Sequence, residues 1–341
     1  MWSLKRSCVL VTNPIYGHKW QQLNQLSAKT NIFRFNSIFV NQLIRNVTQT
    51  KPSVVALSAR SVSTTETTTK TKSALKSESQ LKLAQILSNC RIDSFPLFRD
   101  KDMDSKQLET DFKHLFESMK RCEENQLNQL VYYPSVTAIL STTMSVQSLV
   151  ALDKWKKLKI SQIGEQGFRD YQKNILSRGK LLHLNIKNFL QTRDESSLTL
   201  NESIEKLWTS LSHVLPDIRD VQLCETAVSH PFLYYKGIVD CVAFYSGKLV
   251  IFEWKTSEKQ KPTLKDIYDN PLQAVAYMGA LNYAPDNCQS IKEVVLVYAY
   301  EDGSKCQIHH LNSEQCVKYW GQWLARVKAY WDLIAFKSTT G

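Results

Sequence analysis

Residues 237–256, GIVDCVAFYSGKLVIFEWKT, contain two apolar segments separated by a candidate tight turn. Ser246-Gly247 fits a two-residue hairpin loop, because glycine readily adopts the positive φ that such a loop requires. With that loop, Tyr245 pairs with Lys248 and the two segments form antiparallel strands. Apolar residues occupy both faces of each strand, so the hairpin is expected to be buried on both sides.

The same hairpin carries two acids and a lysine among its apolar residues. In this register Asp240 faces Glu253 directly, and Lys255 lies on the same face because residues two apart on a strand point the same way. Opposed carboxylates in an apolar setting need a cation or a shared proton. A hard divalent metal held by oxygens meets that need. A buried salt bridge of Lys255 with one acid is the alternative, and a one-residue register slip would separate the acids.

Outside the hairpin, the periodicity predicts only helices before Val221, and both strands and helices after it. Helices are predicted at 81–88, 145–160, 165–177 and 201–215, with 177–190 also read as helical, and further helices begin at Pro271 and Ser313; strands are predicted at 221–230, 294–300 and 306–311. Ser135, Asn270 and Ser313 are the expected N-caps, since their side chains can accept hydrogen bonds from free helix amides.

Three further polar features have both a structural and a functional interpretation. His183 shares a helix face with Gly179, where a backbone could approach closely, but a lone helix histidine is more often hydrogen-bonded than a ligand. Glu225 lies in strand 221–230 and could extend the site, although an exposed face is the favoured interpretation of a lone strand acid. Lys259 belongs to a basic loop that is either solvated or in contact with phosphate.

The first 65 residues contain no acid and eight Lys or Arg, so they supply +8 of the chain's net charge of +11 and leave +3 for residues 66–341. An acid-poor, Arg-bearing, Ser-rich segment is typical of a mitochondrial transit peptide; a basic arm that binds nucleic acid is the alternative. Residues 66–129 are expected to be a linker and a weakly ordered segment, and 130–338 the folded domain. Net charge alone does not mark that domain as a nucleic-acid binder.

Cysteine spacing argues against a zinc site, and hydropathy argues against a membrane-spanning helix. The eight cysteines form no CxxC pair, and no histidine pair completes a zinc pattern, so reduced structural thiols are expected. No apolar run reaches 18 residues, so no membrane insertion is predicted.

Four short motifs occur in one order along the chain: GxxxH at 179–183, Asp240, EWK at 253–255 and QxxxY at 273–277. Together they resemble the RecB-type branch of the PD-(D/E)XK nuclease superfamily. A longer match, PSVT at 134–137 and the stretch 237–280, resembles a mitochondrial exonuclease of that branch. The resemblance covers roughly residues 130–335 and implies a restriction-endonuclease-like α/β core, a small mixed sheet flanked by helices, with an N-terminal helical region.

The resemblance also implies an activity, a cofactor and partners. It implies a metal-dependent exonuclease on single-stranded DNA, which hydrolyses phosphodiester bonds and trims flaps and free ends in mitochondrial DNA replication and maintenance. The expected setting is a monomer in the mitochondrial matrix, acting beside the replication machinery with Mg²⁺ or Mn²⁺. A catalytically inactive nucleic-acid-binding protein on a nuclease fold is the main alternative, and a structural matrix protein with buried ion pairs is the second.

The implied site assigns a role to each motif residue. The metal ligands would be Asp240, Glu253, the Trp254 carbonyl and, directly or through water, His183. Lys255 would orient the attacking water or stabilise the transition state. The residues expected to position the substrate are Gln273, Tyr277, Ser135, Thr137, Lys180 and Lys259.

Overall fold

The structure is a computed structural model that describes residues 80–98, 110, 112–113, 117, 133–284 and 290–339. All of these belong to one unit of the chain, Ser63–Gly341. The expected transit peptide at 1–65 and much of the 66–129 segment lie outside the described residues, so those expectations stay predictions.

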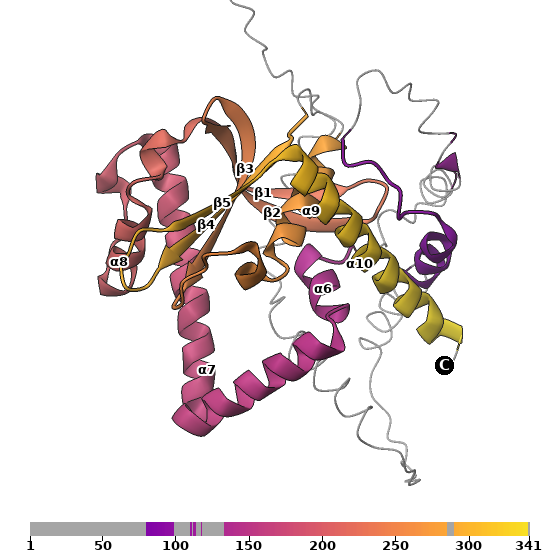
Figure 1. Cartoon of the computed structure of the whole chain (residues 1–341), viewed down its shortest axis with the longest axis horizontal. Helices are drawn as coiled ribbons and strands as arrows, with labels where there is room; N and C mark the ends of the chain where they lie inside the picture. The colour runs from indigo at the N-terminus through magenta and orange to yellow at the C-terminus, as the bar shows by residue number, and fades with distance from the viewer. Residues whose placement is uncertain are drawn as a thin grey trace, which may run out of the picture. The chain divides into compact units, whose positions relative to one another are not determined.

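One five-stranded sheet forms the centre of this unit (Figure 1). Its strands are β1 (Arg219–His230), β2 (Tyr235–Tyr245), β3 (Lys248–Ser257), β4 (Glu293–Tyr300) and β5 (Gln307–Leu311), in spatial order β1-β2-β3-β4-β5. All neighbours are antiparallel except β3 and β4, whose parallel pairing requires a crossover, and helix α9 (Asn270–Asn282) lies within it. The predicted α/β class with a small mixed sheet and helices on both faces is confirmed.

The central hairpin has the predicted register. Tyr245 pairs with Lys248, and the pairing continues to Cys241 opposite Phe252. Ser246 and Gly247 form the loop with φ of 50° and 77°, the positive values of a type I′ turn.

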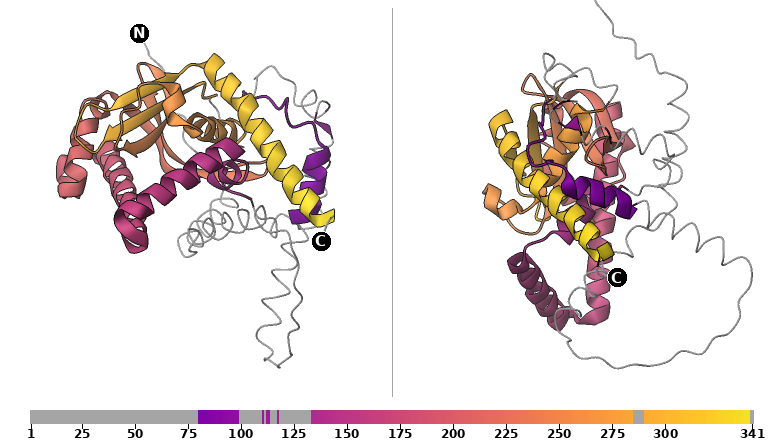
Figure 2. Two further views of the ribbon diagram at one scale, coloured as in Figure 1. Left: turned by 60° about the horizontal axis from the view of Figure 1, so that its bottom comes forward. Right: turned by 90° about the vertical axis from the view of Figure 1, so that its right-hand side faces the viewer.

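Helices flank the sheet on both sides (Figures 1 and 2). Besides α9 they are α6 (Val136–Thr142), α7 (Val146–Thr192), α8 (Glu202–Leu211) and α10 (Ser313–Thr339), with an unlabelled helix at 80–89 and short 3-10 turns at Glu195–Ser197, Leu215–Asp217 and Leu264–Ile267. Gly164, at φ 73° and ψ 168°, interrupts α7 and divides it into two arms. The interruption falls between the helices predicted at 145–160 and 165–177.

Two apolar clusters, one on each face of the sheet, hold these layers together. One joins α6, α9 and α10 to the sheet, and the other joins the second arm of α7 and α8 to it. The first cluster also contains Leu83, Leu87, Ile92 and Phe95. The core thus extends farther toward the N-terminus than the start expected near residue 130.

Two predicted caps and one predicted close approach differ from the structure. Asp269, not Asn270, is the N-cap of α9. Asn312 precedes α10 and exchanges hydrogen bonds with Gln315 in a reciprocal cap, so Ser313 is already helical. A Cβ on Gly179 would meet no heavy atom within 4 Å, so no backbone approaches there.

Among the described residues, no single helix has the length and apolar character needed to cross a membrane. The bent pair of α6 and α7, at 95°, satisfies that test only on length and composition.

Candidate active site

The candidate site lies where β2 and β3 cease to pair. Beyond Cys241 and Phe252 the same register places Asp240 opposite Glu253. Asp240 is 8% exposed and Glu253 is 1% exposed, so both carboxylates are buried. The amide of Trp254 donates a 2.8 Å hydrogen bond to Asp240 Oδ2, so here a side chain accepts from the backbone of β3.

A third acid enters from β1. Cys224 pairs with Cys241 and Thr226 pairs with Val239, so Glu225 stands opposite Asp240. Asp240 therefore has an acid opposite it on each neighbouring strand, an arrangement that like-charge repulsion disfavours without a compensating cation.

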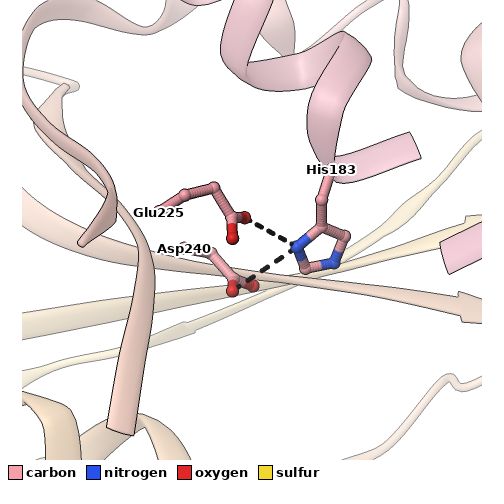
Figure 3. Close-up of side chains that lie close together, drawn as sticks. All are labelled: His183, Glu225 and Asp240. Atoms are coloured by element: carbon pink, nitrogen blue, oxygen red, sulfur yellow. Dashed lines mark hydrogen bonds and ion pairs between the residues drawn. The ribbon is translucent and has the colours of Figure 1, made fainter. Parts of the chain in front are cut away.

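His183, from the second arm of α7, contacts two of these acids (Figure 3). Its Nδ1 lies 2.9 Å from Glu225 Oε1 and 3.5 Å from Asp240 Oδ1. One ligand atom from each of the three residues falls within 4.8 Å of the other two, so the group could hold a metal ion. His183 is thus hydrogen-bonded within the site, and its role as a metal ligand stays a prediction.

The other half of the site is a chain of polar contacts between β3 and α9. Lys255 Nζ donates to Glu253 Oε1 at 2.7 Å and to Gln273 Oε1 at 3.2 Å. The Gln273 amide nitrogen donates to the same Glu253 oxygen at 2.7 Å and contacts the Tyr277 hydroxyl at 3.0 Å. Gln273 thus holds the acid and the lysine by direct hydrogen bonds, and Tyr277 in turn contacts Gln273.

Close packing determines where α9 lies. A Cβ on Gly237 would fall 2.2 Å from Cε1 of Tyr277, so the tyrosine ring rests directly on the backbone of β2. On the same helix a Cβ on Gly279 would fall 2.4 Å from the Trp320 ring of α10. The absence of these two side chains allows α9 to approach both neighbours.

Burial and neighbouring charges together shift the pKa values of the site. Burial, followed by the charge of Glu253, raises the pKa of Asp240 to about 8, against the effects of His183 and Lys255. Burial acts to lower the pKa of His183, but the Glu225 hydrogen bond and the charge of Asp240 outweigh it and raise the pKa to about 9. Burial likewise opposes the charge on Lys255, and Glu253 and Asp240 outweigh it, so the Lys255 pKa is raised. The site therefore favours positive charge.

One carboxylate oxygen of the site is free to bind a cation. Glu253 Oε2 is buried and has no hydrogen-bond partner. A buried carboxylate oxygen without a partner is costly, and a divalent metal with oxygen and imidazole ligands would satisfy it. The residues present thus fit a divalent metal ion.

The interpretation of Glu225 as an acid on an exposed face was wrong. Its side chain is half-buried and bonded to His183. Glu225 has φ of 48°, and β1 contains a register shift between Arg219 and Leu223. The shift ends before Glu225, whose neighbours Cys224 and Thr226 pair regularly with β2, so the register and not the bulge places Glu225 opposite Asp240. The position of its strand beside the two acids was the only signal of this role in the sequence.

The remaining predicted positions lie on elements that carry or adjoin the strands and helices of the site. Ser135 caps α6 by accepting from the Ala138 amide and contacts the Thr137 hydroxyl at 3.0 Å. The Pro134 carbonyl accepts from the Lys236 amide, which ties this cap to β2. Lys180 is exposed on α7, and Lys259 is exposed in the loop after β3. Substrate contacts by these residues, and metal ligation by Glu253 and the Trp254 carbonyl, stay predictions.

Comparison with known proteins adds a consistent similarity. No protein-family model matches the chain. The chain is 41% identical over 202 residues to mitochondrial genome maintenance exonuclease 1 of Homo sapiens, 41% over 199 residues to that of Mus musculus and 40% over 197 residues to that of Xenopus tropicalis. Each match covers 58% of this chain and 57–58% of the relative, so the chain spans less than two thirds of the length of the relatives it matches.

Proposed function

We propose that this chain is a metal-dependent exonuclease that hydrolyses phosphodiester bonds of single-stranded DNA. The observation that carries the proposal is that two groups lie at the same end of the β2–β3 hairpin. One is the candidate metal group His183–Glu225–Asp240, and the other is the Glu253–Lys255 pair. The relatives named as mitochondrial genome maintenance exonuclease support the same reaction class.

Asp240, Glu225 and His183 would hold the metal, with the free oxygen of Glu253 and the Trp254 carbonyl as further candidate ligands. A bound divalent ion supplies a water of lowered pKa and neutralises charge on phosphate. Mg²⁺ suits a site of carboxylates, and Mn²⁺ also accepts the imidazole. The Trp254 amide fixes one oxygen of Asp240, which leaves the other directed at His183.

Lys255 is the proposed catalytic cation. Its raised pKa keeps it charged at neutral pH, and Glu253 and Gln273 restrict the position of its ammonium group. A fixed point charge beside a phosphate can orient water or stabilise the oxyanion that develops in the transition state. Gln273 and Tyr277 position this lysine.

The biological setting is part of the proposal. Single-stranded and flap DNA with a free end are the proposed substrates, within mitochondrial DNA replication and maintenance and beside the replication machinery. A monomer in the matrix is the proposed form. The acid-free composition of residues 1–65 supports import, and a fusion of those residues to a fluorescent protein should enter mitochondria; a diffuse cytosolic signal would contradict it.

A nuclease assay on the purified chain tests the proposal. Labelled linear single strands, flap substrates, duplexes and circular single strands are incubated with Mg²⁺, with Mn²⁺ or with a chelator. Linear single strands and flaps should be degraded only with metal, while circles should resist because they offer no end. Binding without cleavage under every condition would identify an inactive nucleic-acid binder, and neither binding nor cleavage would indicate a structural protein.

A further inference from the structure

Two cysteines stand directly opposite each other beside the metal group. Cys224 on β1 pairs with Cys241 on β2, and both are free thiols. Cys241 is a buried member of the apolar cluster that joins α7 and α8 to the sheet, and Cys224 packs against the same cluster, so both side chains lie on one face of the sheet. Opposed residues in an antiparallel pair have Cα atoms about 4.5–5.5 Å apart, which falls within the roughly 4.4–6.8 Å range that a disulfide spans.

The position of this pair links it to the candidate site. Cys224 immediately precedes Glu225, and Cys241 immediately follows Asp240, so the thiols are adjacent in sequence to both acids that contact His183. Cys241 is fully buried, whereas Cys224 is half-buried. A small oxidant would therefore reach Cys224 first.

We propose that Cys224 and Cys241 form a cross-strand disulfide on oxidation and that this bond weakens divalent-metal binding at the adjacent His183–Glu225–Asp240 group. In a reducing compartment such a disulfide is transient and regulatory rather than structural. The second half of the proposal rests on the proposed metal site, whereas the first half does not.

A hydroperoxide is the oxidant class that balances the reaction. The sulfur of Cys224, as thiolate, attacks one peroxide oxygen, the O–O bond breaks, and Cys224 becomes a sulfenic acid while the other oxygen leaves as an alcohol or water. The Cys241 sulfur then attacks the sulfenic sulfur, its proton is lost, and the hydroxyl group leaves as water. Two thiols lose two electrons in total, and the peroxide gains them.

The expected effect on the metal group follows from distances. Opposed Cβ atoms about 4.5–5.5 Å apart must approach to about 3.8 Å when the disulfide forms. Glu225 and Asp240 are bonded directly to these residues, so their carboxylates move with the backbone. Since Mg²⁺ demands near-octahedral geometry, and altered support of ligands typically costs about 10–100-fold in affinity, metal binding should weaken.

Peptide mapping of the full-length protein tests the disulfide. The protein is treated with hydrogen peroxide, blocked with N-ethylmaleimide and digested with trypsin without reduction. Cleavage at Arg219, Lys236 and Lys248 separates the two cysteines into different peptides. The linked mass of 220–236 and 237–248 should appear and should vanish on treatment with dithiothreitol. It should persist in Cys90→Ser, whose thiol lies in the other core cluster, and be absent from Cys224→Ser.

Recovery of both peptides only as blocked thiols, or of Cys224 as sulfinic acid without a link, overturns the proposal. Calorimetric titration with Mn²⁺ then tests the metal effect. Oxidised wild type should bind Mn²⁺ about 10-fold or more weakly than reduced wild type, and dithiothreitol should restore the affinity. Linked protein with unchanged Mn²⁺ affinity overturns that half. If reduced wild type binds no Mn²⁺, the proposed metal site itself fails, while the peptide map still decides the disulfide.

Discussion

The amide of Trp254 donates to Oδ2 of Asp240 at 2.8 Å, so a backbone group of β3 orients an acid of β2. This bond leaves Oδ1 of Asp240 3.5 Å from His183. The orientation of Asp240 within the candidate metal group is thus set by the main chain of the hairpin. Replacing the acid by its amide tests the charge of Asp240 with small change in shape.

Asp240→Asn should be more stable than wild type without metal and less responsive to metal. The pKa of Asp240 is raised to about 8, so its ionisation disfavours the folded state above the unfolded pKa of about 3.9, and this cost grows until the pH exceeds 8. At pH 8 the variant should gain about 1 kcal/mol or more in free energy of unfolding. Mn²⁺ at 100 times its Kd should stabilise wild type by about 2.7 kcal/mol, and the variant by little.

Thermal unfolding with and without Mn²⁺ measures both effects, and nuclease activity should be lost together with the metal response. Asp332→Asn, at an exposed ion pair with Lys328, is the matched control and should behave as wild type. An Asp240→Asn protein with full metal response would remove Asp240 from the ligand set.

Lys255→Met should retain DNA and metal binding while cleavage falls about 10²–10³-fold, because Lys255 is proposed to act on the transition state. Methionine keeps the length and apolar stem of the side chain but removes its charge. Thermal unfolding distinguishes this role from a buried ion pair, whose disruption would cost about 3–5 kcal/mol. A folded variant with normal turnover would contradict the catalytic role. Lys248→Met removes a surface lysine paired with Glu293 and provides the control.

Gly237→Ala and Gly179→Ala should have opposite effects on stability. The added Cβ at Gly237 would fall 2.2 Å from the Tyr277 ring, so the ring must shift at a cost of about 1–3 kcal/mol. The shift should also displace Gln273 and reduce turnover. At Gly179, in α7, the new methyl meets open space and should add about 0.5–1 kcal/mol of stability through helix propensity. Urea unfolding of both variants measures this, and equal effects would refute the packing argument.

Acid should weaken the fold through His230. Its Nδ1 accepts from the amides of Phe232 and Leu233, at 3.2 and 3.1 Å, which requires the neutral ring, and complete burial lowers its pKa to about 3. The folded pKa lies below the unfolded value of about 6.5, so this stability is fully present above pH 6.5 and falls by about 1.4 kcal/mol per pH unit from there toward pH 3.

Urea unfolding at pH 7 and pH 5 should therefore show a loss of about 2 kcal/mol from this residue. His230→Asn can still accept from the turn amides and does not titrate, so its loss between the two pH values should be smaller by that amount. His310→Asn replaces a surface histidine paired with Glu293 and should keep the wild-type difference. An unchanged pH dependence in His230→Asn would contradict this assignment.

The sequence predicted the features that depend on neighbouring residues, and not those that depend on tertiary packing. The two-residue Ser246-Gly247 loop was enough to predict the register of the hairpin, because the length of the turn sets which residues pair. The places of His183, Gln273 and Tyr277 came from family resemblance, since spacing alone does not show which helix packs on which strand. Glu225 has a left-handed φ within β1, and a glutamate in the sequence does not indicate that backbone conformation.

Helix α9 is buried on nearly every side, with Tyr277 against Gly237 and Gly279 against the ring of Trp320. The helix that holds Gln273 against Lys255 is therefore also a buried helix at the centre of the core. Activity and stability are therefore coupled along α9. A substitution at Trp320, which packs against Gly279, would shift α9 and with it the Gln273 side chain that holds Lys255. A substitution that loosens α9 should therefore lower turnover and the free energy of unfolding together.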